Sequence, residues 1–252
     1  MDTVTNTVTN TAMDTVTNAA VSASAGLRAR LALTEPMVRA ATAALWRPTG
    51  LGPRYATYLA VMHGVIRASV PLMERAATLC AALRPYDPVA APLERYLRVH
   101  AEEERGHDDW LLTDLAALGD TAAALAGEQP PPSTARFVGA QYYWIEHHHP
   151  VALLGYIAVL ESNAPAPRLA DHLAASGVPE ASLRTVRAHA ELDDGHTADL
   201  FELLDALPLT PALRRAVTTS ALHTVDGLIA LFARIAGEPR PIHRRPGGTH
   251  PS

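Results

Sequence analysis

Cysteine and aromatic residues are scarce in this sequence. Cys80 is the only cysteine among 252 residues, and aromatic residues make up 5% of the chain. A single thiol cannot close an internal disulfide, so we expect a reducing cytoplasm as the setting and a small core residue as its role. Strand-favouring residues are sparse outside the N-terminal tail, whereas alanine and leucine dominate an apolar content of 48%. This composition predicts helices rather than sheets.

The sequence also lacks a basic cluster, a signal segment and a long apolar run. Its formal charge is −5 and it has no basic cluster, so the sequence does not indicate a basic surface that would bind nucleic acid or an anionic membrane. The N-terminus has no charged-then-apolar segment, and we find no run of about 18 apolar residues. We therefore expect a soluble, cytoplasmic protein with a small-molecule partner, which binds neither nucleic acid nor a membrane.

The chain divides into one long helical region between two tails. Residues 1–25 are rich in Thr, Asn, Val, Ala and Ser, with MDTVTN at both Met1 and Met13, and residues 238–252 are rich in Pro, Gly and Arg. Both tails should be disordered because they hold too little large apolar surface. Residues 26–237 should form one domain. Helical periodicity between Pro and Gly breaks predicts helices over 34–47, 53–83, 88–118, 133–148, 150–162, 165–176, 179–206 and 210–236.

One octapeptide occurs twice, as HAEEERGH at 100–107 and as HAELDDGH at 189–196, with five of eight positions identical. Each copy has a histidine, an acid four residues later and a second histidine three residues further on. In a helix these positions lie at about 0°, 40° and −20°, so they form a narrow stripe on one face. The sequence thus predicts two helices with facing stripes: His100, Glu104 and His107 on one, and His189, Asp193 and His196 on the other.

These residue types suit a metal centre. Imidazole and carboxylate together favour iron or manganese, and carboxylates can bridge two ions while they offset the charge. Helical di-iron proteins use Glu-x-x-His pairs from facing helices, a spacing found in Glu104 with His107 and, with aspartate as the acid, in Asp193 with His196. The alternative is that both stripes are exposed and form ion pairs. Flanking leucines favour a core-facing position, where polar groups need a reason for burial.

Further acids and histidines are candidates for this site. Glu161 ends a run that is uncharged over 151–160, so we expect a buried, paired carboxylate that binds metal. Glu74 is a candidate of the same kind, although neighbouring arginines offer it ordinary ion pairs. The run His147–His149 covers about 200° of a helix and cannot all reach one ion. We expect it to line a pocket, support a ligand or interact with helix-end carbonyls, while Tyr142–Trp144 pack.

The residues now assembled resemble a known family, the haem-oxygenase-like di-iron oxidases and oxygenases, which are iron-containing redox enzymes. The likeness runs over residues 50–236, through EExGHDxW at 103–110, LGYxxxLE at 154–161 and HxxxDxxH at 189–196. It implies an all-α fold, a seven-helix bundle of haem-oxygenase type. Carried over residue by residue, it implies an iron-ligand set of Glu104, His107, Glu161, His189, Asp193 and His196.

Two details of this ligand set stay open. Relatives differ in where the early acid lies, so Glu103 is an alternative to Glu104. His100 is then a seventh ligand or a group that supports the ligands.

For function, the resemblance implies two Fe(II) ions that activate O2 and oxidise an amino-acid-like or fatty-acid-like substrate. The outcomes in this family are N-oxygenation, desaturation or oxidative C–C cleavage, often in natural-product biosynthesis. An external electron donor and a homodimer also fit it. Two other hypotheses stay open: a metal-free small-molecule enzyme on the same scaffold, thiaminase-like or quinone-cofactor-synthesis-like, and a non-catalytic iron-binding protein.

Overall fold

The alanine- and leucine-rich segments form helices along the whole described chain. The computed structural model describes residues 22–237, without the side chains of residues 167 and 191–194. Within these residues there are eleven α-helices, two 3-10 helices and no strand, which confirms the all-α expectation. Residues 1–21 of the expected N-terminal tail (1–25) and the whole expected C-terminal tail (238–252) lie outside the described residues. The elements are α1 (Ala23–Leu45), α2 (Leu51–Ile66), α3 (Ser69–Leu83), α4 (Ala90–Glu103), α5 (His107–Ala117), α6 (Asp120–Ala126), α7 (Pro132–His147), η1 (Pro150–Ala152), α8 (Leu153–Glu161), α9 (Pro167–Ala175), η2 (Glu180–Ser182), α10 (Arg184–Ala206) and α11 (Pro211–Gly237).

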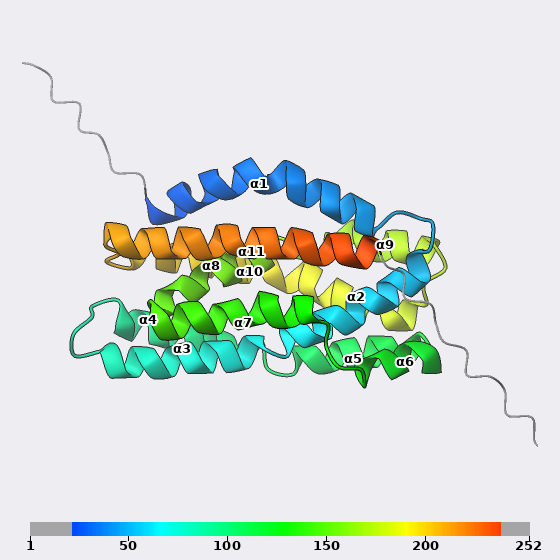
Figure 1. Cartoon of the computed structure of the whole chain (residues 1–252), viewed down its shortest axis with the longest axis horizontal. Coiled ribbons are helices and arrows are strands. Elements are labelled where there is room, and N and C mark those ends of the chain that lie inside the picture. The colour runs from blue at the N-terminus through cyan, green and yellow to red at the C-terminus, as the bar shows by residue number, and fades with distance from the viewer. Residues whose placement is uncertain (1–21, 238–252) are drawn as a thin grey trace, which may run out of the picture.

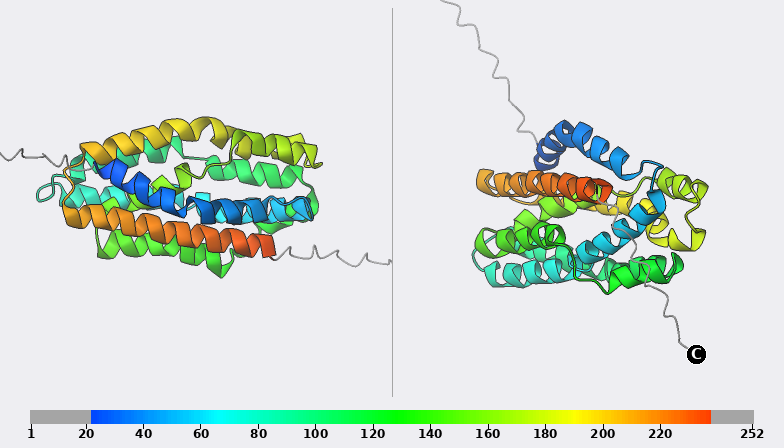
Figure 2. Two further views of the ribbon diagram at one scale, coloured as in Figure 1. Left: turned by 90° about the horizontal axis from the view of Figure 1, so that it is seen from above. Right: turned by 45° about the vertical axis from the view of Figure 1, so that its right-hand side comes forward.

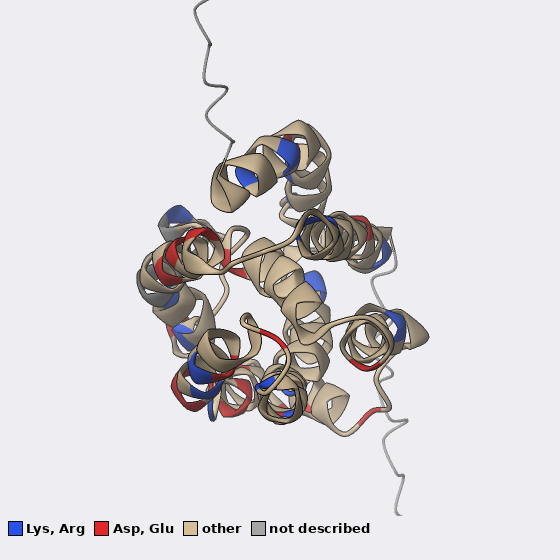
Figure 3. Ribbon diagram, turned by 90° about the vertical axis from the view of Figure 1, so that its left-hand side faces the viewer, with Lys and Arg blue, Asp and Glu red and all other residues tan. Residues whose placement is uncertain are grey.

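Most of the helices run along one long axis and surround an apolar centre (Figure 1). α1 packs on α11, α3 packs on α4, and α8 contacts both α10 and α11. Seen from above, α1 lies between α10 and α11 (Figure 2). Seen end-on, the charged residues lie mostly on the outer helices (Figure 3). α8 is the central element, because its residues from Leu153 to Val159 are all buried.

Two helices expected to be continuous are each divided in the structure. The expected helix 53–83 is α2 followed by α3, because Pro71 has no N–H to donate and its ring clashes with the carbonyl of Arg67. The expected helix 88–118 is α4 followed by α5, and the break lies inside the first octapeptide. Gly106 adopts φ +85° there, a left-handed conformation that glycine reaches without a steric penalty. The prediction of one helix for His100 and His107 is therefore wrong.

The first helix begins earlier than expected. α1 starts at Ala23, before the expected domain boundary at residue 26 and before the expected helix start at residue 34. Ser22 caps it by accepting a hydrogen bond from the Ala25 N–H. Ser24 donates to Asp205 at the far end of α10, through its backbone N–H at 2.8 Å and its hydroxyl at 2.6 Å. This long-range attachment holds the start of α1 and leaves no signal in the local sequence.

A close helix crossing fixes the position of α8. A Cβ atom added at Gly155 would lie 2.3 Å from the carbonyl oxygen of Val217 and 2.7 Å from the backbone nitrogen of Ala221. Only glycine therefore allows α8 to lie this close to α11. The crossing sets where α8 ends, and α8 ends at Glu161.

α11 is the most apolar long helix. Among the described residues it is the one helix long and apolar enough to cross a membrane by length and composition, with an 18-residue window of mean hydropathy 1.4 that is 44% buried. Polar residues such as Thr224 and Asp226 interrupt this helix, so it is not the continuous run of about 18 apolar residues that the sequence was expected to lack. α11 also packs against α1, α7 and α8, and the core helix of a globular protein meets the same criteria.

Candidate metal centre

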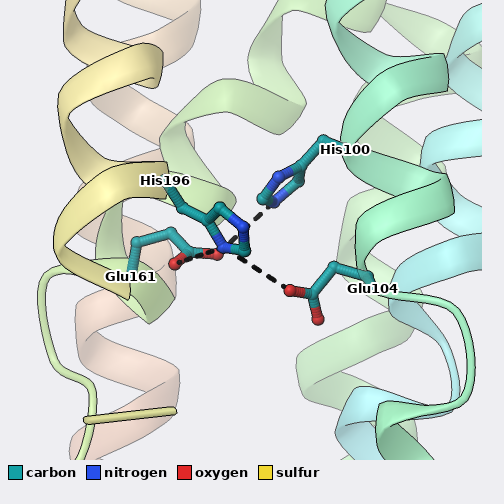
Figure 4. A group of neighbouring side chains, drawn as sticks. All are labelled: His100, Glu104, Glu161 and His196. Carbon is teal, nitrogen blue, oxygen red and sulfur yellow. Dashed lines mark ion pairs between the residues drawn. The ribbon is translucent and has the colours of Figure 1, made fainter. Parts of the chain in front are cut away.

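Three helices bring two histidines and two glutamates to one point in the core (Figure 4). His100 lies in the last turn of α4, Glu104 follows directly after α4, Glu161 ends α8 and His196 lies on α10. One ligand atom from each of the four lies within 4.8 Å of the others. First-row metal ions take such ligands at about 2.1 Å, so two donors on one ion are at most about 4.2 Å apart. Small side-chain movements would let this group close around one ion.

A second group of potential ligands adjoins the first. Glu104, His107 and His189 also offer donor atoms within 4.8 Å of one another. His107 is the first residue of α5 and its Nδ1 lies 3.2 Å from Glu104 Oε2. The ring of His189, on α10, is 5.3 Å from that of His107 at 77°. The two groups share Glu104, and a shared carboxylate is what two neighbouring ions require.

The ligand atoms of the first group are close to one another without satisfying one another. His196 Nδ1 lies 3.6 Å from Glu161 Oε2 and 3.7 Å from Glu104 Oε1, and His100 Nε2 lies 3.4 Å from Glu161 Oε1. Glu161 Oε2 and His196 Nδ1 are buried and have no hydrogen-bond partner. An unsatisfied buried polar atom costs about 1–3 kcal/mol. A metal ion bound by both atoms would remove this cost, so the residues fit such an ion.

The charges in the group also suit metal binding. Burial alone would raise the pKa of Glu161, but its neighbouring histidines outweigh burial and lower it to about 2. Glu104 follows the same pattern, with a pKa below its ordinary value. The Glu161 carboxylate raises the pKa of His196 to about 9, whereas burial lowers the pKa of His189. Metal ions need ionised carboxylates and neutral imidazoles, so at neutral pH only His196 of these four must release a proton.

A hydrogen-bond chain orients His189. Its Nδ1 lies 3.0 Å from the carbonyl oxygen of Thr185. Because a carbonyl only accepts, Nδ1 carries the proton and Nε2 is left to bind a metal ion. The first turn of α10 is held in turn by Asp114 of α5, which accepts from the N–H groups of Arg184 and Thr185 at 3.2 and 2.9 Å.

Asp114 is a functional residue that sequence analysis did not identify. It is fully buried on α5, where burial raises its pKa and the backbone donors of Thr185 and Arg184 oppose this effect. The available signal was its position between Leu111 and Leu115, since an acid on an apolar helix face needs a partner.

The structure brings together most of the residues proposed from the sequence. His100, Glu104, His107, Glu161, His189 and His196 all belong to the two groups. The side chain of Asp193 lies outside the described residues. Between the two early acids, the geometry favours Glu104, whose side chain is 9% exposed, over Glu103, which is 48% exposed and lies 3.6 Å from His100 Nδ1.

Other candidates from the sequence lie away from this centre. Glu74 is 54% exposed and pairs with Arg105 at 3.0 Å, which is an ordinary ion pair. His149 lies 2.6 Å from Asp87 through Nε2 and accepts from a backbone N–H through Nδ1, so it ties two loops together. Tyr143 is 55% exposed, so the expectation that the whole segment Tyr142–Trp144 packs is wrong.

A cavity lies against the centre. His100, Glu104, Glu161 and His189 form one wall, and the rest is mostly apolar, with Met62, Leu72, Ile157 and Phe232 among its residues. Its volume, counted as the space that the centre of a water molecule can occupy, is about 90 Å³. A small apolar group could therefore lie next to the ligands.

Comparison with known proteins agrees with this geometry. The model of a family described as iron-containing redox enzymes matches residues 69–228. The chain belongs to this family. That match spans α3 to α11 and contains every residue of the two ligand groups. A search of curated proteins gives no significant match.

Two solved structures share the fold. A domain of unknown function with a haem oxygenase-like fold from Shewanella denitrificans is 16% identical, with a TM-score of 0.68, over 82% of this chain and 89% of that one. A TenA homolog from Pseudomonas syringae pv. tomato is 15% identical, with a TM-score of 0.67, over 86% and 93% of the two chains. At these identities the likeness concerns the fold, and it confirms the haem-oxygenase-like bundle.

Proposed function

We propose that this family member is a non-haem di-iron oxidase or oxygenase that activates O2 to oxidise a small substrate. The observation that carries the proposal is the pair of buried ligand groups that share Glu104 beside an apolar cavity. A single structural ion would need only one such group. A cavity that reaches the ligands would let a substrate approach them, which a storage site does not need.

The residues have separate tasks in this proposal. Glu104 and Glu161 hold negative charge in a low-dielectric core and offset divalent ions. His107 and His189 serve one position, and His100 and His196 serve the other, with Asp193 as a further ligand implied by the family. Two bound iron ions would supply the electrons that reduce O2 and the oxidising power that acts on the substrate. The apolar wall excludes water, which limits side reactions at the centre.

The remaining assignments extend the same proposal. The substrate is amino-acid-like or fatty-acid-like, the reaction is N-oxygenation, desaturation or oxidative C–C cleavage, and the setting is natural-product biosynthesis in the cytoplasm. An external electron donor reduces the centre between turnovers, and the protein acts as a homodimer.

A metal-free small-molecule enzyme is the second candidate, because the bundle is shared with a TenA homolog. The unsatisfied ligand atoms of Glu161 and His196 count against it. In a metal-free enzyme they would stay buried without partners.

Anaerobic titration with Fe(II), followed by rapid mixing with O2 and absorbance measurement, tests the proposal. We expect about two ions per chain and a transient absorbance change that depends on both iron and O2. A metal-free enzyme would bind no stoichiometric iron. A non-catalytic iron-binding protein would bind iron and consume only the O2 needed to oxidise it, with no catalytic turnover.

A further inference from the structure

A second cavity lies across α2 from the metal centre. Met62 and Ile66 of α2 line the cavity beside the ligand groups, whereas Val61 and Gly64, on the opposite face of the helix, line the second one. The second cavity holds about 80 Å³, counted as the space that the centre of a water molecule can occupy. One water needs about 10–15 Å³ by this measure, so there is room for a group several times larger. Among the described residues, no member of the two ligand groups lines it.

The first turn of α7, which contacts α2, forms one wall of this cavity and has polar groups without partners. Ser133 lines the cavity, and its Oγ atom is buried and has no hydrogen-bond partner. The Oγ1 atom of the next residue, Thr134, is also buried without a partner, and its methyl group lies against Gly64. The N–H groups of a first helical turn lack partners within the helix, and they favour an anion. A bound acceptor would satisfy the hydroxyl of Ser133, which is unfavourable when buried alone.

Arginine side chains give the cavity positive charge. Arg67, which follows directly after α2, is exposed and makes no ion pair with the side chains that the structure describes. Arg234 of α11 and Glu128 also line the cavity, and each already has an interaction within the protein. Burial and the neighbouring Arg67 lower the pKa of His63, so this imidazole is neutral near pH 7. Arg67 is therefore the cation with which an incoming anion would pair.

We infer that this cavity binds a small organic phosphate, whose phosphate group lies between Arg67 and the first turn of α7. The guanidinium donates through two parallel N–H groups, and Ser133 adds a hydroxyl from another element. A phosphate monoester offers three terminal oxygens to these donors, whereas a carboxylate offers two. Much of the remaining lining is apolar, with Leu125, Pro130 and Ile235 among its residues, so it suits a small ring or a branched chain. The site shares no residue with the metal centre, and the inference does not depend on the proposed function.

Binding of phenyl phosphate to the full chain, measured by calorimetry, tests the inference. We expect one molecule per chain, with phenol at least about tenfold weaker and benzoate at least about threefold weaker. Arg67→Gln should weaken phenyl phosphate binding about tenfold or more, because it removes a charge-assisted contact. Ser133→Ala should weaken it about three- to tenfold, because it removes one hydrogen bond. The matched control is Arg95→Gln, an exposed arginine on α4 that lines neither cavity, and it should leave the affinity unchanged.

Two further variants separate this site from the metal centre and from a nonspecific charge effect. Glu128→Gln should tighten phenyl phosphate binding about two- to fivefold, because it removes the one carboxylate among the lining residues. His196→Ala should leave the affinity unchanged, whereas a phosphate bound among the metal ligands would lose a contact. Circular dichroism checks that each variant is folded. No binding of phenyl phosphate, an affinity unchanged by Arg67→Gln, weaker binding in His196→Ala, or benzoate that binds as tightly as phenyl phosphate would overturn the inference.

Discussion

His196 Nδ1 and Glu161 Oε2 face each other in the core at 3.6 Å, too far for a hydrogen bond, and neither atom has another hydrogen-bond partner. Such an arrangement is costly in a metal-free protein and favourable around an ion. The pair is therefore the most sensitive place to test the metal centre.

His196→Ala and Glu161→Gln should each lower iron binding from about two ions to about one per chain and abolish the O2-dependent absorbance transient. The helical fold should survive, because packing in the core is apolar. His147→Ala is the matched control, since His147 is exposed and belongs to neither ligand group. Iron analysis and circular dichroism of the three variants check this pattern. Full iron loading in both ligand variants would rule out these residues as ligands.

Protons should leave the centre when metal binds. The pKa of His196 is raised to about 9 by Glu161, so near pH 7 this imidazole is protonated in the metal-free protein and must lose its proton to bind iron. We expect release of about one proton per iron bound at this position, and an affinity that rises roughly tenfold per pH unit up to about pH 8. Calorimetry in two buffers of different ionisation enthalpy measures the proton count. An affinity independent of pH over this range would contradict the assignment.

The same shift predicts how the stability of the metal-free protein depends on pH. Because His196 has a higher pKa in the folded protein than in the unfolded chain, its protonated form adds to the free energy of unfolding. This contribution is complete below the unfolded pKa of about 6.5, and it is lost as the pH rises through the folded pKa of about 9.

The ligand residues of the centre could be predicted from the sequence, whereas the residues that hold those ligands in place could not. Glu104 and His107 were predicted because their octapeptide recurs at 189–196, although the helix face assumed for the first copy is interrupted at Gly106. The role of Asp114 was not predicted, because its partners are backbone N–H groups 70 and 71 positions further along the chain. Every residue except proline has a backbone N–H group, so the sequence does not indicate which of these groups a buried carboxylate will bind.

At the scale of single elements, the start of α10 and the break between α4 and α5 matter most for the site. Sequence periodicity located α10 well, but it joined α4 to α5 because the apolar pattern continues across the break. The break depends on the backbone conformation of Gly106, and glycine inside a helical pattern is ambiguous between a tolerated residue and a turn.

Asp114→Asn should loosen α10 at its first turn and thereby His189. The carboxylate has two acceptor oxygens for the two N–H groups, whereas the amide has only one. We therefore expect a loss of about 0.5–2 kcal/mol in unfolding free energy. Iron affinity at the position served by His189 should fall about 10- to 100-fold, as for other groups that orient a metal ligand. Asp226→Asn, the same change at an exposed site on α11, is the control. Equal iron affinity in the two variants would show that Asp114 only stabilises the fold.

For the whole molecule, composition and helical periodicity predicted a helical bundle, the motif resemblance implied its haem-oxygenase-like type, and the comparison with solved structures confirms that type. The position of α1 across α10 and α11 did not follow, because it depends on contacts such as that between Ser24 and Asp205. Sequence periodicity says which face is apolar and not which helix covers it.

Iron should stabilise the entire bundle, because the ligands come from α4, α5, α8, α10 and the turn between α4 and α5. With free Fe(II) at about 100 times its dissociation constant, one site adds about 2.7 kcal/mol to the unfolding free energy. For a domain of this size that corresponds to a Tm higher by roughly 5–10 °C. Anaerobic differential scanning calorimetry with and without Fe(II) measures the shift, with His196→Ala as a control that should show a smaller one. An unchanged Tm would mean that no iron is held between these helices.

Because Glu104 belongs to both ligand groups, the two binding events are thermodynamically coupled. Among the described side chains, the group with His100 and His196 has two carboxylates, and the group with His107 and His189 has only the shared one. The first ion should therefore occupy the carboxylate-rich position, and it withdraws charge from Glu104 that the second ion also needs. Occupancy would be sequential with negative cooperativity. When iron is scarce, most molecules would hold one ion, and the arrival of the second would decide how many carry a complete centre.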